Sequence, residues 1–210
     1  MRLAACRFDE RCDTERALLL LSRSGLSAEE CERLRCIRHP SARAASVAAR
    51  LALLWALSDA EDKLSVHDFD ELPPIEGEPL STFRRTERGP LLVGGDLAIS
   101  FAHSEPLSVC AVTRGCRVGV DVERLDRTVR LPRSIPPFFS SREVALLDAA
   151  DDRTEAFLRI WTRKEALGKA LGTGLHNTVA ALDTTAHRFA EYTVEGTLIS
   201  VFTEKTEGRI

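Results

Sequence analysis

The chain has 210 residues, of which 44% are hydrophobic and 29% charged, and its formal net charge is −3. This length allows one large or two small domains with a buried core. The slight excess of acids speaks against nucleic acid as a partner, and no segment approaches the roughly 20 consecutive apolar residues that a membrane-spanning helix needs. The first residues lack the apolar region and small-residue cleavage site of a signal peptide, so we expect a cytoplasmic protein.

The first half of the chain predicts a strand followed by helices. Residues 2–8 predict a strand and residues 14–24 a helix. Ser27 and Glu30 have the spacing of a capping box, so another short helix should begin there. The Ala- and Leu-rich run 40–58 begins with a proline, which is tolerated in a first helical turn, and predicts the longest helix of this half.

Proline and glycine in residues 70–79 and again in 85–96 predict loops. Three strand-like runs follow, at 97–104, 107–113 and 117–123, and the short turns between them are typical of an antiparallel meander.

The second half repeats the order of helices and then strands. Ser140 and Glu143 form a second capping-box pattern, and residues 154–172 predict a long amphipathic helix. Residues 188–205 predict a β-hairpin. Helices and strands that are segregated twice along the chain indicate an α+β protein built of two related halves.

Six cysteines contain no CxxC pair, and the histidines do not stand at zinc-ligand spacings from them. We therefore expect reduced, mostly buried thiols.

Two acids close the third strand-like run. Asp121 and Glu123 are two residues apart, so in a strand they share one face at a separation of about 7 Å. Solvent at an exposed strand end would relieve their repulsion. A hard cation would also relieve it, because Mg²⁺ accepts one or two carboxylates and completes its shell with water and phosphate oxygens.

The long second-half helix carries another candidate cluster. Trp161, Glu165 and Lys169 are spaced by four and share one helix face, with Lys164 beside it. A Glu–Lys pair on a solvated face explains this pattern, with Trp161 in the core. The chain has only four lysines among its 29 basic residues, however, and two of them lie here.

Together these segments resemble the 4'-phosphopantetheinyl transferase superfamily, of the type that activates surfactin synthetase. The paired motifs are GVDVE (Gly119–Glu123) and WTRKEALGK (Trp161–Lys169). Upstream, GPLL (Gly89–Leu92) and ISFAHS (Ile99–Ser104) are similar to two further segments of that family.

The resemblance implies an enzyme that transfers the 4'-phosphopantetheine arm of coenzyme A to a serine of an apo acyl or peptidyl carrier protein, releasing adenosine 3',5'-bisphosphate. It implies Mg²⁺ held by Asp121, Glu123 and Glu165, and catalysis by Glu165 and Lys169. Either Glu165 or a lysine would take the proton of the serine.

Contacts to coenzyme A are implied for four residues: Arg43, His103, Ser104 and Lys169. The resemblance also implies a monomer of two similar subdomains, 1–108 and 109–210, related by a pseudo-twofold axis, each a small, mainly antiparallel sheet packed with helices. The coenzyme contacts would come mainly from the first subdomain, and the metal and catalytic residues from the second.

Some positions depart from the family pattern. Ala102 replaces a serine that would bind phosphate, and a lysine expected after Gly89 is absent, with Arg88 as a possible substitute. Val122 stands between the two acids and offers no further ligand. The arginine-rich run 83–88 is a candidate surface for docking an acidic carrier protein.

Two other functions use the same features. The chain could be a different Mg²⁺-dependent phosphoryl-transfer or phosphodiester-cleaving enzyme with water as the nucleophile. It could also be a non-catalytic module that binds carrier proteins, although such a module has no need of three acids facing a metal.

Overall fold

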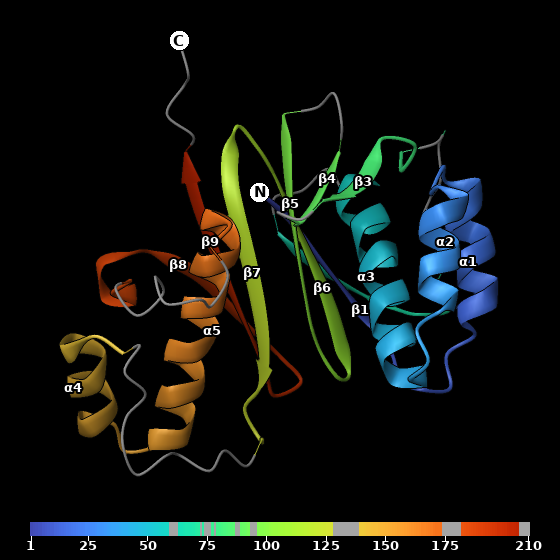
Figure 1. Cartoon of the computed structure of the whole chain (residues 1–210). Helices are drawn as coiled ribbons and strands as arrows, with labels where there is room; N and C mark the ends of the chain where they lie inside the picture. The colour runs from blue at the N-terminus through green and yellow to red at the C-terminus, as the bar shows by residue number, and fades with distance from the viewer. Residues whose placement is uncertain are drawn as a thin grey trace.

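The structure is a computed structural model that describes residues 1–58, 63–71, 73, 77, 79–86, 89–92, 96–127, 139–173 and 182–205. Strands occupy the middle of the molecule and helices lie on its two outer sides (Figure 1). In chain order the elements are β1 (Arg2–Arg7), α1 (Thr14–Arg23), α2 (Ala28–Arg35), α3 (Pro40–Ser58), β2 (Leu64–Asp68), β3 (Phe83–Thr86), β4 (Gly89–Leu92), β5 (Leu97–Ser104), β6 (Leu107–Arg114), β7 (Cys116–Arg124), α4 (Ser141–Ala149), α5 (Arg153–Leu171), the 3-10 helix η2 (Thr184–Ala186), β8 (Phe189–Val194) and β9 (Thr197–Lys205).

Side chains that cap the helices explain why they begin and end where the sequence predicts. The Ser27 hydroxyl accepts a hydrogen bond from the Glu30 N–H at the start of α2. At α4 the capping box is complete, because the Ser140 hydroxyl accepts from the Glu143 N–H and the Glu143 carboxylate accepts from the Ser140 N–H. Helix α5 ends at Gly172, whose φ of 68° is readily adopted only by glycine.

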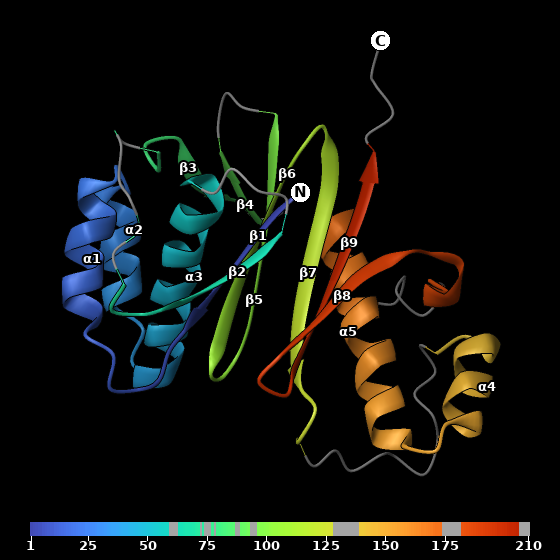
Figure 2. The same ribbon diagram turned by 180° about the vertical axis from the view of Figure 1, so that it is seen from behind.

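The first half forms a six-stranded sheet in the order β2-β1-β6-β5-β4-β3. All neighbouring strands are antiparallel except β1 and β2, which are parallel. Helices α1, α2 and α3 cover one face of this sheet, as Figure 2 also shows from behind. Buried residues such as Cys6 of β1, Leu34 of α2 and Leu51 of α3 join helices and sheet in one apolar cluster.

The second half forms a separate three-stranded antiparallel sheet in the order β7-β9-β8. Its hairpin turns at Glu195 and Gly196, where φ is +50° and +73°. Positive φ at both central residues is the geometry of the tight turn that suits twisted strands. The hairpin predicted over 188–205 is therefore confirmed.

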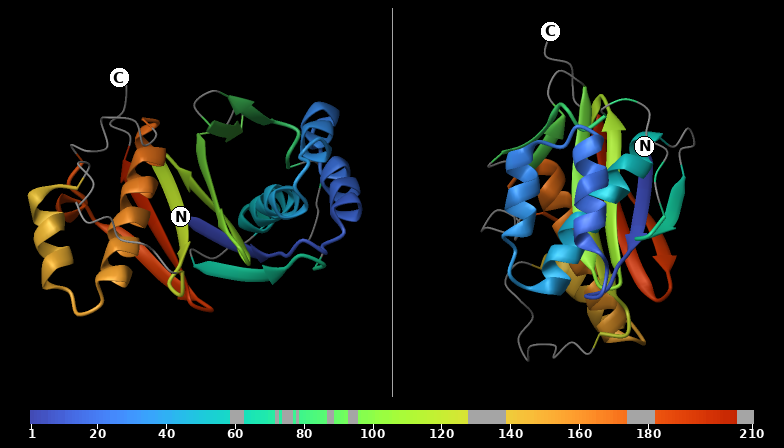
Figure 3. Two further views of the ribbon diagram at one scale, coloured as in Figure 1. Left: turned by 60° about the horizontal axis from the view of Figure 1, so that its bottom comes forward. Right: turned by 90° about the vertical axis from the view of Figure 1, so that its right-hand side faces the viewer.

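The two sheets pack face to face. Side chains alternate along β1, so that Ala4 and Cys6 face the helices while Leu3 and Ala5 face the second sheet. There they join an apolar cluster with Val120 of β7. The molecule has four layers, with α1–α3, the large sheet, the small sheet and then α5 with α4, and the left view of Figure 3 shows this order.

Several expectations change in detail. Strands β5 and β6 form the predicted hairpin, but the predicted meander does not continue, because β7 leaves β6 and pairs with β9. Part of the loop expected over 85–96 is the β3–β4 hairpin, and β2 had no clear signal in the sequence.

The mixed α+β class is confirmed, whereas the pseudo-twofold relation stays a prediction. The boundary expected between 108 and 109 falls within β6, and the chain passes from one sheet to the other between Arg114 and Cys116.

None of the helices described is both long and apolar enough to span a bilayer. All six cysteines are free thiols. Burial raises the pKa of Cys6 to about 12, so this thiol is inert at neutral pH.

Candidate active site

Strand β7 points its two acids at helix α5. Val118, Val120 and Val122 face the first sheet, so the alternating positions Gly119, Asp121 and Glu123 face the other way.

Glycine is needed at 119 because the helix lies directly on the strand there. A Cβ at this position would come within 1.8 Å of the Ala166 carbonyl oxygen and 2.7 Å of the Ala170 nitrogen. This close approach brings the acids of β7 under the side chains of α5.

Lys169 is the residue of α5 that binds the strand. Its ammonium donates to Asp121 Oδ1 at 2.8 Å and to the Val120 carbonyl oxygen at 3.0 Å. Asp121 is only 9% exposed. Burial raises the pKa of the Asp121 carboxyl, and the charge of Lys169 opposes that rise. The lysine thus compensates a carboxylate that would otherwise be costly to bury.

Glu165 lies one helical turn before Lys169. Burial and the charges of Asp121 and Glu123 raise the pKa of Glu165 to about 7, although Lys169 lowers it. The three predicted acids therefore act on one another electrostatically, as residues of one site do.

An open pocket lies beside these acids. Its lining comes from the end of β7, from Arg127 and from one face of α5: Glu123, Arg127, Phe157, Leu158, Trp161 and Glu165. The Arg127 guanidinium donates to both oxygens of Glu123, at 2.9 and 3.2 Å. Phe139, Phe157 and Trp161 stack in sequence, with ring centroids 5.5 and 6.2 Å apart. The pocket combines carboxylates with an aromatic wall.

Trp161 lines this pocket, whereas the sequence alone also allowed a core position for it. Arg127 is a participant that sequence analysis missed. Its only signal was its place four residues after Glu123, which is unremarkable in a turn.

His103 approaches the site from the first half. It lies near the end of β5, and burial, followed by the charge of Lys169, lowers its pKa. The structure therefore brings His103 close to Lys169 across the two halves.

Arg43 and Ser104 lie in the same part of the first half. The Ser41 hydroxyl, at the start of α3, donates to Glu105 in the β5–β6 turn at 2.7 Å, which holds this end of the helix next to Ser104. The Arg43 Nε atom is buried and has no hydrogen-bond partner in the part of the chain described. Such an orphaned donor is suited to an anion. The roles of Arg43 and Ser104 stay predictions, and Arg88 lies outside the described residues.

Lys164, next to Glu165, is completely buried and faces away from the site. Its ammonium binds Glu143 Oε2 at 2.8 Å and the Leu182 carbonyl oxygen at 2.7 Å. The other Glu143 oxygen accepts two hydrogen bonds from Thr184. This ion pair ties α4, α5 and η2 together, so Lys164 serves the fold.

A magnesium ion would have to displace existing partners. Within the described ranges, no three His, Cys, Asp or Glu side chains are grouped closely enough to hold a metal. Asp121 is bound to Lys169 and Glu123 to Arg127. The donors are nonetheless carboxylate oxygens, which Mg²⁺ prefers, and this ion needs only one or two of them. The ligand chemistry fits, and the metal assignment stays a prediction.

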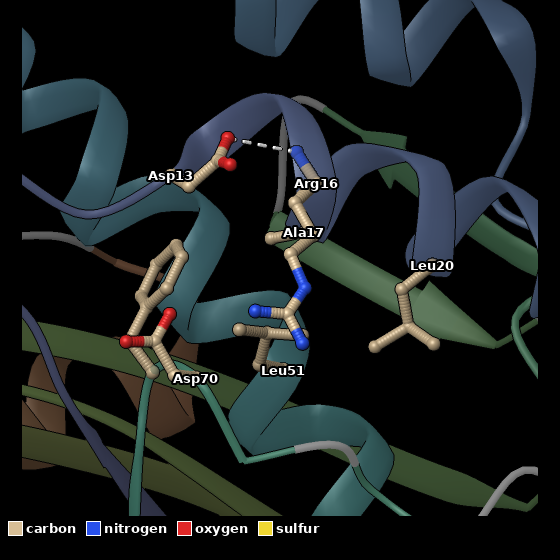
Figure 4. A pocket seen from close by; sticks show the side chains of 7 residues that line it. Asp13, Arg16, Ala17, Leu20, Leu51 and Asp70 are labelled. Carbon is tan, nitrogen blue, oxygen red and sulfur yellow. Dashed lines mark hydrogen bonds between the residues drawn. The ribbon is translucent and has the colours of Figure 1, made fainter.

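A second pocket lies on the first half, away from every predicted site residue (Figure 4). There Asp13 accepts a hydrogen bond from the Arg16 N–H at 3.0 Å, which caps α1. The lining residues are Asp13, Arg16, Ala17, Leu20, Leu51, Phe69 and Asp70. The helix cap explains the position of the Asp13 carboxylate in this lining.

Comparison with known proteins finds a family that the second half of the chain resembles. A family model described as the 4'-phosphopantetheinyl transferase superfamily matches residues 117–207. This segment of the chain is therefore similar to that superfamily. The match includes β7 and α5, and with them all four acidic and basic residues of the predicted catalytic centre.

Named relatives agree with the superfamily assignment. The 4'-phosphopantetheinyl transferase HetI of Nostoc sp. is 36% identical over 101 residues, which cover 47% of this chain and 40% of HetI. The 4'-phosphopantetheinyl transferase Gsp of Aneurinibacillus migulanus is 31% identical over 97 residues, 45% of this chain and 39% of Gsp. The protein slr0495 of Synechocystis sp. is 28% identical over 166 residues, 78% of this chain and 64% of that protein. The chain thus matches less than two thirds of the length of each relative.

Proposed function

We propose that the protein is a Mg²⁺-dependent 4'-phosphopantetheinyl transferase of the surfactin-synthetase-activating type. It would move the phosphopantetheine arm of coenzyme A to a serine hydroxyl of an apo acyl or peptidyl carrier protein and release adenosine 3',5'-bisphosphate. One observation carries the proposal. Three acids from β7 and α5 act on one another beside Lys169, within the segment that matches the superfamily.

Asp121, Glu123 and Glu165 are the proposed magnesium ligands. When bound, Mg²⁺ would neutralise and align the pyrophosphate group of coenzyme A. Burial and the charges of Asp121 and Glu123 raise the pKa of Glu165 to about 7, which supports the assignment, since a divalent cation would stabilise all three carboxylates in their ionised form. Lys169 and Arg127, which now bind Asp121 and Glu123, would be free to turn toward phosphate oxygens.

Glu165 is the proposed general base. A carboxylate beside the metal and the attacking group can accept the proton of a serine hydroxyl as that hydroxyl attacks phosphorus. Because the Lys169 ammonium donates to Asp121, it is better suited to stabilise the charge of the departing phosphate than to accept a proton.

The first half would hold the rest of coenzyme A. The charge of Lys169 acts on His103, and Arg43 has a buried Nε that finds no partner among the described residues, and both side chains suit phosphate groups that bring several negative charges. Ser104, at the end of β5, would add a hydroxyl to this set.

The carrier protein would approach over exposed arginines, since such carriers present an acidic helix. Arg84 and Arg85 of β3 are exposed and remain candidates for this contact. We further propose that the protein acts in the cytoplasm as a monomer, with both halves of the site in one chain.

Mass spectrometry of a carrier protein tests the proposal. The protein is mixed with coenzyme A, Mg²⁺ and several apo acyl and peptidyl carriers, and the mass gain of one phosphopantetheine group is expected on at least one. Coenzyme A consumed at the same rate without any carrier would instead identify a hydrolase. Carrier binding with neither reaction would identify a non-catalytic module.

A further inference from the structure

The peptide group of Val120 lies between the two halves of the molecule. Strand β7 is an edge strand of its sheet, so the peptide groups on its outer side have no strand partner. Val120 is fully buried, and water cannot satisfy it. Its N–H donates to the Ser100 hydroxyl at 3.1 Å, and its carbonyl oxygen accepts from Lys169 at 3.0 Å.

Ser100 comes from the opposite half. It lies on β5 of the large sheet and is 5% exposed. Its strand carries His103 three residues further on, while Val120 directly precedes Asp121 on β7. One hydrogen bond therefore joins the strand of a proposed coenzyme contact to the strand of two proposed metal ligands.

Apolar packing alone would not fix the position of β5 relative to β7. The surfaces that meet between the sheets are formed by residues such as Ala102, Val109 and Val122, and such contacts are not directional. A buried hydrogen bond is directional, and loss of its acceptor leaves an unsatisfied N–H. The Arg7–Glu195 contact also joins the halves, but it is exposed and lies at the β8–β9 turn.

We propose that Ser100 is a positioning residue that fixes β5 against β7 at Val120 and so aligns His103 with Lys169 and Asp121. The role rests on the proposed function for its effect on catalysis, but not for the alignment itself. Ser100 touches no reacting group and acts only through the Val120 peptide.

The alignment is tested first on the free protein, without any substrate. Hydrogen exchange followed by NMR should find the Val120 amide strongly protected in the wild type, and fast exchange there would overturn the proposal by itself. In Ser100→Ala, exchange at Val120 should accelerate by about tenfold or more relative to other amides of β7, as expected for a lost hydrogen bond. Ser100→Thr, which keeps the hydroxyl, should restore protection.

A second readout reports on the other side of the contact. The pKa of His103, measured from its ring resonances, should rise in Ser100→Ala, because the strand is less buried and further from Lys169. Thr113→Val is the matched control, since it removes another buried hydroxyl, which donates to the Cys116 carbonyl oxygen at 3.0 Å, without touching Val120. If Ser100→Ala matches the wild type in both measurements, Ser100 has no positioning role.

Activity assays distinguish the positioning role of Ser100 from the proposed transferase function. With coenzyme A and an apo carrier, kcat of Ser100→Ala should fall by about tenfold to a hundredfold, the effect of misplacing a reacting group. Thr113→Val should stay close to the wild type, and Ser100→Thr should recover. If Ser100→Ala alters exchange at Val120 and the pKa of His103, but the wild type shows no transferase activity, the positioning role is supported and the proposed transferase function is refuted. Unaltered kcat with altered exchange would overturn the role of Ser100 in catalysis.

Discussion

The ammonium of Lys169 binds Asp121 Oδ1 at 2.8 Å, which joins the end of α5 to β7 within the site. Lysine at this position does more than balance charge, because its second contact is the Val120 carbonyl oxygen. Both contacts suit the compact head of a lysine.

Lys169→Ala should therefore leave Asp121 buried beside Glu165 with no cation to compensate it. We expect a loss in kcat of about a hundredfold or more, the usual effect of removing a charge-stabilising donor. Lys169→Arg should recover little, because the planar guanidinium does not match this geometry. Steady-state assays with coenzyme A and an apo carrier measure both effects. Lys205→Ala, on an exposed part of β9, serves as the control, and equal losses in the two alanine variants would contradict the assignment.

The pH dependence of stability follows from Glu165. Because its pKa rises from 4.5 to about 7 on folding, the folded protein keeps a proton that the unfolded chain releases between these values. The contribution of Glu165 to the free energy of unfolding should therefore fall as the pH rises from about 4.5 to about 7. Glu165→Gln removes the ionisable group and should flatten this fall, making the variant more stable than the wild type at pH 8 in metal-free buffer.

Urea denaturation between pH 5 and 8 measures this difference. Glu29→Gln, an exposed glutamate of α2, should leave the wild-type profile unchanged. A pH profile of Glu165→Gln identical to that of the wild type would show that folding does not raise the pKa of Glu165.

The elements that local signals determine were predictable. The N-cap at Ser27, the capping box at Ser140, the terminating Gly172 and the tight turn of the last hairpin each act within a few residues, and the sequence shows them directly. The departure of β7 from β6 was not predictable, because a strand run followed by a short turn looks the same whether the next strand joins the old sheet or starts a new one.

The candidate site was likewise predictable only in part. The motifs identified Asp121, Glu123, Glu165 and Lys169, and the need for Gly119 follows from the close approach of α5. The contact of Ser100 with Val120 depends on packing between distant segments and had no signal in the sequence, and the Arg127–Glu123 pair had only its spacing of four residues. The two lysines of the motif also looked alike, although one is buried in an ion pair and the other faces the site.

Arg127 should compete with Mg²⁺ for Glu123. Its guanidinium holds both carboxylate oxygens, but it is exposed, and exposed ion pairs are weak. Arg127→Ala should therefore lower the Mg²⁺ concentration for half-maximal activity by only about two- to fivefold. Glu123→Ala should abolish transfer and its dependence on Mg²⁺ while the fold stays intact.

Titration of activity with Mg²⁺ tests both variants, and circular dichroism checks their fold. Arg84→Ala, which removes an exposed arginine of β3, controls for the change in charge. Transfer that survives in Glu123→Ala with unchanged Mg²⁺ dependence would refute the metal assignment.

Breaking the buried ion pair of Lys164 and Glu143 should lower the stability of the protein without directly lowering its catalytic activity. Neither side chain is accessible to solvent, and their charges meet at 2.8 Å. Lys164→Met leaves the Glu143 carboxylate buried without its cation, which should lower the free energy of unfolding by about 3–5 kcal/mol. In Lys164→Met/Glu143→Gln the uncompensated charge is gone, and the amide oxygen can still accept the hydrogen bonds from Thr184. The double variant should therefore be more stable than Lys164→Met alone.

Chemical denaturation of the wild type, Lys164→Met and the double variant measures this difference in stability. The kcat of the folded fraction should remain near that of the wild type. A double variant no more stable than Lys164→Met would show that loss of packing, not the unpaired charge, is responsible.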